Sequence, residues 1–373
     1  MKKISRLRVE KSKKKEESAS KVYTIGLDLG DKKSQYCVLD GTGEIVGEGS
    51  VSTSRMALEQ QFKSYAGSVV ALEAGTHSGW VSRVLKQMGL ETVVANPRKV
   101  RLIAESTQKS DPEDARMLAR LARVDRKLLF EIHHRSEAAQ LDLTVIRARA
   151  GLVEARTKLV NSLRGLTKTL GSRLRKCDAG GITVEVLEGL PEAVKEALTP
   201  LVVQIQSLTV GIEEYDQRIA AGGKQYPEIE RLKQVRGVGD VIALTYVLTL
   251  GDKARFERSR DVGCYLGMVS KRRNSSESQP ELSISKEGDT YLRSLLVQGA
   301  HYILSRRGPD TDLKRWGLRL AQRGDQKSKG KKAKRRAVVA VARKLGVLLH
   351  RLWVSGEKYE PLRQARQQEQ QAA

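Results

Sequence analysis

The sequence predicts an α/β domain followed by mainly helical parts, and three observations support this fold class. Across residues 22–135, short apolar runs of strand length alternate with segments of helical periodicity. Residues 136–222 instead repeat apolar side chains at spacings of three and four, as long amphipathic helices do. Residues 223–356 contain further helical patterns, whereas residues 1–21 and 357–373 are polar. We therefore expect a basic arm, an α/β domain, a coiled-coil region, a helical C-terminal domain and a polar tail.

The α/β order is readable in more detail. Three strand-like runs come first, separated by turn residues around Asp31 and Gly41, and they predict an antiparallel meander. Two further strand runs follow, each preceded by a helical segment, so this order fits a ribonuclease-H-like sheet. The expected strands lie in residues 22–30, 35–40, 44–52, 69–74 and 91–97, and the first helix in residues 56–65.

Net charge and amino-acid composition indicate which kinds of partner this protein binds. The 373 residues include 68 Lys and Arg against 44 Asp and Glu, a formal net charge of +24, which predicts binding to a polyanion. Aromatic residues make up only 4% of the chain, which favours phosphate contacts over base stacking. No apolar run approaches the roughly 18 residues of a membrane span, and residues 1–21 do not resemble a secretory signal, so we expect a cytoplasmic protein. Three widely spaced cysteines favour neither disulfides nor a structural zinc site.

Four carboxylates stand out in the α/β domain. Asp28 lies within an apolar strand run, and Glu73 ends another. Burying an unpaired carboxylate is costly, so both are expected to have a cationic partner. Asp111 and Asp114 open a helix whose expected first residue is Pro112, and their spacing of three places them on one helix face, with Glu113 pointing elsewhere.

Four converging carboxylates would repel one another unless divalent ions lay between them. Ligand sets made only of oxygen suit Mg²⁺ or Mn²⁺, and two such ions can support phosphodiester chemistry. We therefore predict a metal site at Asp28, Glu73, Asp111 and Asp114. A simple N-cap role is an alternative for Asp111. A sugar kinase of the actin-like class shares the GLDLG run, but such an enzyme needs neither the high positive charge nor a basic cluster.

The helical region has two apolar stripes, the second of which keeps a heptad spacing. They predict two long helices that form either an antiparallel pair or an intermolecular coiled coil, and a plain helical core remains an alternative. The first stripe comprises Leu141, Val145, Ala148, Leu152, Ala155 and Leu159, and the second comprises Leu198, Leu201, Ile205, Leu208, Ile212, Tyr215 and Ile219.

Two features of the C-terminal part suggest contact with nucleic acid. Gly237 and Gly239 precede an apolar helix, as in the hairpin of a helix-hairpin-helix element that binds DNA backbone, although a simple tight turn would look the same. The run KSKGKKAKRR at residues 327–336 is either a solvated segment or a nucleic-acid patch, and the high net charge favours the patch. Its candidate contacts are Lys331, Lys332, Lys334, Arg335 and Arg336. No base-reading motif is evident.

The order of these motifs resembles a known family, the DEDD transposases of the insertion sequence 110 family with its 1111 subgroup, regarded as bridge-RNA-guided serine recombinases. The resemblance spans nearly the whole chain and rests on GLDLG, LEAGTHSGW, NPRKVR, KSDPEDAR, RGVGDVIA, CYLGMVSKRRNSSES and ISKEGDTYLRSLLVQGA, in this order. It implies a RuvC-like domain whose four acids correspond to Asp28, Glu73, Asp111 and Asp114. It also implies a coiled coil and a C-terminal domain with a nucleophilic serine.

The resemblance places that serine between Tyr265-Leu266-Gly267 and residues 284–289, in a stretch that commonly reads Ser-Ser-Gly. Here the stretch reads Asn274-Ser275-Ser276-Glu277-Ser278, so the family glycine is missing. Spacing from both flanks favours Ser275, with Ser276 second. A serine nucleophile conserves the energy of the broken DNA bond in a phosphoserine link, with metals and the adjacent Lys271, Arg272 and Arg273 as candidates to balance phosphate charge.

The resemblance further implies an obligate homo-oligomer, expected to be a tetramer built from dimers, in which the serine of one protomer completes the carboxylate site of another. Its implied partners are donor and target double-stranded DNA and a structured guide RNA that supplies sequence selection. Two other hypotheses remain: a RuvC-like nuclease that hydrolyses branched DNA, and a non-catalytic nucleic-acid-binding assembly protein.

Overall fold

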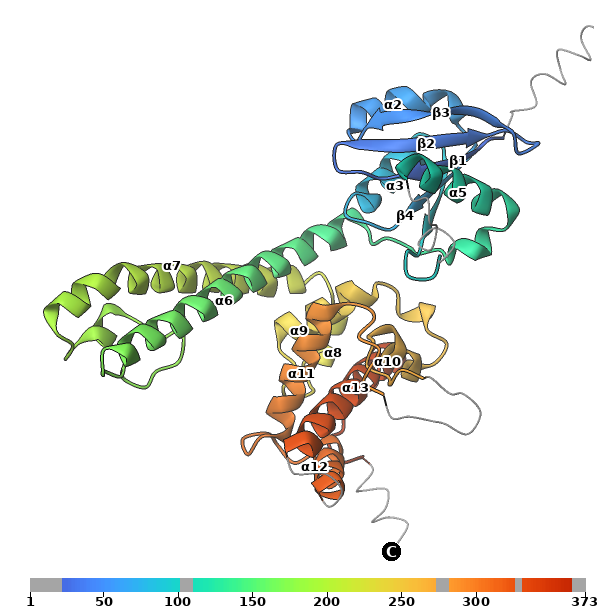
Figure 1. Ribbon diagram of the computed structural model, residues 1–373. Helices are drawn as coiled ribbons and strands as arrows, with labels where there is room; N and C mark the ends of the chain where they lie inside the picture. Colours follow the sequence, from blue (N-terminus) through green and yellow to red (C-terminus); the bar gives the residue numbers. More distant parts are fainter. Residues whose placement is uncertain (1–21, 101–109, 273–281, 326–330, 364–373) are drawn as a thin grey trace, which may run out of the picture. The chain divides into compact units, whose positions relative to one another are not determined.

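The computed structural model describes residues 22–100, 110–272, 282–325 and 331–363 (Figure 1). The chain divides into two compact units, residues 1–135 and 136–373, and each is described by itself. None of the helices in these described ranges is both long and apolar enough to cross a membrane.

The first unit is built on a five-stranded mixed sheet with the order β3-β2-β1-β4-β5. The neighbours β1, β2 and β3 pair antiparallel, which confirms the predicted meander, whereas β4 pairs parallel to both β1 and β5. Four of the five strands fall within the runs that the sequence indicated, whereas β2 begins two residues before its expected run, at Lys33, which was expected in the turn. Their bounds are Thr24–Asp28 (β1), Lys33–Leu39 (β2), Ile45–Ser52 (β3), Val69–Glu73 (β4) and Glu91–Ala95 (β5).

Helices cover both faces of this sheet. On one face, α2 (Arg55–Phe62) and α3 (Ser78–Gln87) bury their apolar side chains against alternate strand residues such as Ile25 and Leu27. The turn Lys63–Tyr65 (η1) continues α2 and completes the helix expected at residues 56–65. On the other face, α5 (Asp111–Val124) packs against β1, β2 and β4, and the turn Arg126–Leu129 (η2) follows it.

Gly26 in β1 shows how closely α5 packs against the sheet. A Cβ atom added at Gly26 would lie 1.9 Å from the carbonyl oxygen of Ala115 and 2.6 Å from the amide nitrogen of Ala119. Both are main-chain atoms of α5, so only glycine allows the helix to approach the strand this closely. Ala115 and Ala119 are themselves fully buried.

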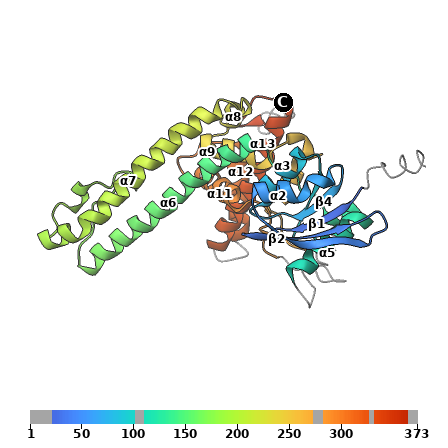
Figure 2. The same cartoon turned by 90° about the horizontal axis from the view of Figure 1, so that it is seen from above.

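The second unit begins with two long helices, α6 (Glu137–Thr169) and α7 (Glu192–Gly223), which lie side by side in both views (Figure 2). Their side-chain contacts pair Arg149 with Asp216 and Arg156 with Thr209, so position rises on one helix as it falls on the other. The helices are therefore antiparallel within one chain, which is the first of the two predicted arrangements. The turn Val184–Leu187 (η3) lies in their connection.

The structure confirms buried heptad positions in the predicted apolar stripe of α7 but not the start of the stripe predicted for α6. In α7, Leu198, Ile205, Ile212 and Ile219 are all buried at heptad spacing, as expected. In α6, the stripe was placed wrongly at its start, because Leu141 is 63% exposed while Leu143 and Ile146 are buried. The beginning of α6 packs against the C-terminal helices as well as against α7, and this second partner rotates the buried face.

The rest of the unit is a helical bundle around one apolar core, in which α11 and α13 pack together and α9 packs against α11. Tyr246 of α9 is fully buried there, and its hydroxyl donates to the Gly346 carbonyl oxygen at 2.6 Å. The helices are α8 (Glu228–Leu232), α9 (Asp240–Leu250), α10 (Val262–Tyr265), α11 (Thr290–Leu304), α12 (Asp312–Asp325) and α13 (Lys331–Ser355), with turns at Lys253–Arg255 (η4) and Ser259–Asp261 (η5).

Candidate active site

Two of the four predicted acids occupy equivalent places on neighbouring strands. Leu27 of β1 lies opposite Leu72 of the parallel strand β4, and Asp28 and Glu73 are the next and last residues of these strands. Side chains alternate along a strand, so both acids share the sheet face of Gly26 and Ala71, which α5 covers. Asp28 thus ends its strand rather than lying inside it, and both acids are partly exposed rather than fully buried.

The helix that carries the other two acids begins at this same edge of the sheet. The middle of α5 lies over Gly26. Near the C-terminal end of α5, Arg123 donates to the Gly41 carbonyl oxygen, just after the end of β2, which lies beside the start of β1. Consequently α5 runs antiparallel to β1, and its first turn, with Asp111 and Asp114, lies toward the edge where Asp28 and Glu73 end their strands. Local sequence explains the helix start, since Pro112 suits a first turn.

Two details of this helix start differ from expectation. The N-cap residue is Ser110, with an extended backbone, and Asp111 is the first helical residue with Pro112 second. The alternative of an N-cap role for Asp111 is therefore wrong. Asp111 is exposed, and Asp114 is partly exposed.

Glu113 belongs to a separate ion-pair group, as its position in the helix suggested. The Arg116 guanidinium donates to Glu113 Oε2 at 3.1 Å and to Glu48 Oε2 of β3 at 2.8 Å. These hydrogen bonds from Arg116 hold the pKa of the Glu48 carboxyl below its ordinary value. Glu113 is thus engaged by a cation from its own helix.

The backbone collects four acids toward one edge of the sheet, yet their side chains do not converge. Among the described residues, no three His, Cys, Asp or Glu side chains form a group that could hold a metal ion as they stand. The donor set is nevertheless made only of carboxylate oxygens, which is the chemistry that Mg²⁺ and Mn²⁺ favour.

A histidine that the sequence left without a role lies at the same edge. His77, which follows β4, places Nε2 3.3 Å from Asp31 Oδ1 in the turn that follows β1. Its Nδ1 accepts a hydrogen bond from Trp80 Nε1 at 3.1 Å, so the proton of the neutral ring is on Nε2. The pair ties together the two loops that continue from Asp28 and Glu73. The spacing in THSGW carries no signal for this contact, because Asp31 is distant in sequence.

The predicted hairpin glycines lie where expected, before α9. Gly237 has a positive φ of 98°, and a Cβ there would meet Tyr302 at 3.0 Å, so packing against α11 already requires glycine. Gly239 is the N-cap residue of α9. Beside them, Lys233 Nζ contacts Asp240 at 2.7 Å and Glu230 at 3.0 Å, and these hydrogen bonds raise the pKa of the Lys233 amine. A pocket of about 450 Å³ opens here, with Arg236 in its wall.

The basic cluster forms the start of α13. Lys332, Lys334, Arg335 and Arg336 are exposed, whereas Ala333 and Ala337 on the other face are buried. No acid occupies the first turn, so these cations lie at the positive end of the helix dipole, which disfavours them. Lys271 and Arg272 are also exposed. Arg273, Ser275, Ser276 and residues 327–330 lie outside the described residues, as does the side chain of Lys331.

Comparisons with known proteins agree with this arrangement. The family model of the DEDD transposases of IS110 matches residues 25–170, which include the sheet and all four acids. A second model, described as the transposase IS116/IS110/IS902 family, matches residues 229–314.

Similar proteins extend over most of the chain. The transposase for insertion sequence element IS1111A of Coxiella burnetii is 27% identical over 93% of this chain and 94% of its own length. A probable family 20 transposase of Pseudomonas aeruginosa is 29% identical over 80% of this chain and 89% of its own. The transposase for insertion sequence element IS1328 of Yersinia enterocolitica is 26% identical over 76% and 85%.

An α/β sheet with carboxylates at the ends of parallel strands, joined to a basic helical unit, is typical of enzymes that act on nucleic acids, and the matches specify transposases. The chain belongs to the IS110 family of DEDD transposases. DNA is therefore the substrate, and cutting DNA is the activity of the class. The DEDD family name indicates that the class uses divalent metal ions.

Proposed function

We propose that this transposase is an RNA-guided DNA recombinase that cuts and rejoins strands through a covalent phosphoserine link. The observation that supports it best is the placement of Asp28 and Glu73 on one face at adjacent strand ends, with the α5 start carrying Asp111 and Asp114 toward the same edge. The strand order and the meander also fit a ribonuclease-H-like, RuvC-type domain. These four carboxylates would hold Mg²⁺ or Mn²⁺, which when bound would lower the pKa of the attacking hydroxyl and offset phosphate charge.

The proposed covalent step conserves phosphodiester bonds. The hydroxyl of Ser275, or of Ser276, loses its proton, and its Oγ forms a bond to a DNA phosphorus atom. The bond from that phosphorus to one deoxyribose oxygen breaks, and this oxygen leaves with a proton as a free hydroxyl. One phosphodiester has replaced another, so attack by a hydroxyl of a different strand reverses the step and rejoins the DNA without ATP.

Other residues support binding in this proposal. The exposed Lys271 and Arg272, together with Arg273, flank the serines and would hold the phosphate. The α13 start, with Lys331, Lys332, Lys334, Arg335 and Arg336, and the turn at Gly237 and Gly239 would contact the nucleic-acid backbone. A guide RNA would select sequence, and a tetramer would let the serine of one protomer meet the acids of another.

A covalent-adduct assay tests this function. Purified protein is incubated with Mg²⁺, labelled donor and target DNA, and RNA transcribed from the flanks of the element. A denaturing gel should show a protein–DNA band that disappears with Ser275→Ala and persists with Ser276→Ala. The opposite pattern would move the nucleophile to Ser276. Cleavage without any adduct would instead support the nuclease that hydrolyses branched DNA, and no cleavage but intact binding would support the assembly protein.

The basic start of α13 provides a second test. Changing Lys332, Lys334, Arg335 and Arg336 to Gln should weaken DNA binding and reduce the slope of log affinity against log salt by up to about 3 to 4, because each lost phosphate contact removes about 0.9 from the slope. A matched control neutralises four exposed cations near the far end of α6: Lys168, Arg173, Arg175 and Lys176. If both quadruple variants lose the same affinity and slope, only net charge matters and the assignment to α13 is wrong.

A further inference from the structure

Arg293 of α11 is a buried cation in the second unit, only 9% exposed. Burying a guanidinium is costly unless its donors are satisfied, and an aliphatic side chain would fill the same space without that cost. Its contacts therefore indicate what the arginine contributes. Nη1 donates to the Leu266 carbonyl oxygen at 3.0 Å and to the Glu287 carbonyl oxygen at 2.8 Å, and Nη2 donates to Thr290 Oγ1 at 3.2 Å.

The two carbonyl groups belong to two chain segments that are joined by main-chain hydrogen bonds. Between these segments, the Lys286 amide donates to Gly267 O at 3.0 Å, Ser285 to Val269 O at 2.8 Å, and Lys271 to Ser283 O at 3.0 Å. Residues 267–271 and 283–286 thus form a short ladder. This ladder brackets residues 272–282 in the sequence, the stretch that contains Ser275 and Ser276, and Arg293 bridges its base.

The base of the ladder is packed backbone against backbone. A Cβ at Gly267 would lie 2.0 Å from the Glu287 carbonyl oxygen, and one at Gly288 would lie 2.1 Å from the Tyr265 carbonyl oxygen. Both glycines have positive φ values, 66° and 79°. Leu266 is fully buried, so its carbonyl oxygen needs a donor from within the protein. Nη1 of Arg293 donates to this oxygen and also to the Glu287 carbonyl oxygen in the other segment.

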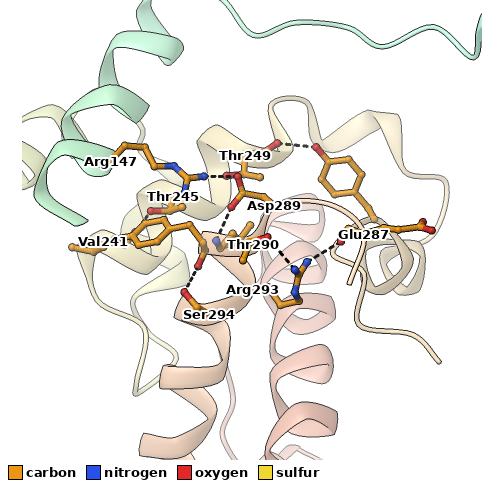
Figure 3. A network of polar contacts seen from close by, with 12 residues as sticks. Arg147, Val241, Thr245, Thr249, Glu287, Asp289, Thr290, Arg293 and Ser294 are labelled. Carbon is orange, nitrogen blue, oxygen red and sulfur yellow. Dashed lines mark hydrogen bonds and ion pairs between the residues drawn. The ribbon is translucent and has the colours of Figure 1, made fainter. Parts of the chain in front are cut away.

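The helix that carries Arg293 is itself held at its start. Asp289 caps α11, since its Oδ1 accepts from the Leu292 amide at 2.7 Å. Its Oδ2 accepts from Arg147 of α6, whose guanidinium also lies 4.7 Å from the Tyr291 ring centre (Figure 3). The first turn of α11 therefore contacts α6, and Arg293 reaches from the same helix to the ladder.

We propose that Arg293 is a positioning residue for the transposase nucleophile: by bridging Leu266 and Glu287 it sets the spacing and direction of the two strands that bracket the serine-bearing segment. This inference rests on the proposed function, because it requires that Ser275 or Ser276 attack DNA. Arg293 acts through the main chain and touches neither DNA nor metal in this proposal. Lysine keeps the charge but ends in a single nitrogen on a shorter group, so it cannot place donors both at the Nη1 position, which serves the two carbonyl groups, and at the Nη2 position, which serves Thr290.

The test compares Arg293→Lys with Arg149→Lys in the covalent-adduct assay. Arg149 is the matched control because its guanidinium also makes a bidentate contact, to Asp216 of α7 at 2.6 and 3.0 Å, and its further contact is with the Tyr291 side chain rather than with either carbonyl group. Two quantities are measured for each variant: the rate constant of adduct formation and the final amount of adduct. If Arg293 had only a structural role, its substitution would lower the final amount of adduct, because less protein is folded. The rate constant of adduct formation would stay unchanged.

We expect Arg293→Lys to lower the rate constant by roughly 10- to 100-fold, the scale of a misplacement of about 1 Å at a reacting group. DNA affinity should stay within about twofold of the wild type, and Arg149→Lys should retain the wild-type rate constant. Hydrogen exchange should accelerate at the Ser285 and Lys286 amides in Arg293→Lys alone. A wild-type rate constant for Arg293→Lys would overturn the proposal.

If Arg293→Lys does not fold, Thr290→Val decides the question, since it removes one acceptor of the same guanidinium from an exposed position. A several-fold lower rate constant is then expected, and an unchanged one refutes the inference. Failure of the proposed function looks different. In that case the wild-type protein cleaves DNA without forming adduct, or Ser275→Ala and Ser276→Ala both form adduct at the wild-type rate, whatever Arg293→Lys does.

Discussion

Asp28→Asn is expected to abolish DNA cutting while leaving the first unit folded. The amide has the shape of the carboxylate but no charge, so it would weaken metal binding at the sheet edge. Loss of several kcal/mol of transition-state stabilisation corresponds to a fall of about 1,000-fold or more in rate. Asp28 is the partly exposed last residue of β1, and the core residues Ile25 and Leu27 are untouched, so circular dichroism and the melting temperature should change little.

Glu113→Gln is the matched control for Asp28→Asn. Glu113 lies in the same first turn of α5 as Asp111 and Asp114, but its carboxylate pairs with Arg116. The control should cut DNA at close to the wild-type rate, since it is outside the proposed ligand set. Undiminished cutting by Asp28→Asn would refute both the recombinase and the nuclease forms of the metal site. Equal loss in both variants would show that any charge change at the start of α5 is harmful.

Gly26→Ala is expected to lower the free energy of unfolding of the first unit strongly, because it adds a methyl group where α5 packs against β1. The added Cβ would overlap two main-chain atoms of α5, at 1.9 and 2.6 Å, and neither can move without the helix. Overpacking in a core typically costs about 1 to 3 kcal/mol, and a clash with two main-chain atoms of one helix should reach or exceed the top of that range. The displaced helix carries Asp111 and Asp114, so DNA cutting should be lost as well.

Urea unfolding and hydrogen exchange would measure this effect. The β1 and α5 amides should exchange faster in Gly26→Ala, while the amides of α6, α7, α9 and α11 keep their protection. Gly41→Ala is the control, because an added Cβ there meets nothing within 4 Å. It should change the free energy of unfolding by no more than about 0.5 kcal/mol. Equal stability of the two variants would mean that α5 does not pack on β1 as described.

Structural features that depend on local sequence patterns were well predicted. The five strands, the meander and the buried heptad positions of α7 follow from spacing and turn residues, which act over a few neighbours in the chain. The stripe of α6 was misplaced at Leu141, because the side of a helix that is buried depends on what packs there. Similarly, the pairing of β1 with β4 decides that Asp28 ends a strand beside Glu73.

The sequence by itself determined the family and the order of the elements and singled out the four candidate acids, since these depend on residue types and their spacing. Only the tertiary structure decided that α5 runs antiparallel to β1 and brings Asp111 and Asp114 toward the edge of Asp28 and Glu73. It also decided that Arg293 is buried and bridges two carbonyl groups. Spacing cannot reveal such contacts, because their free energy depends on groups distant in sequence that meet only when the chain is folded.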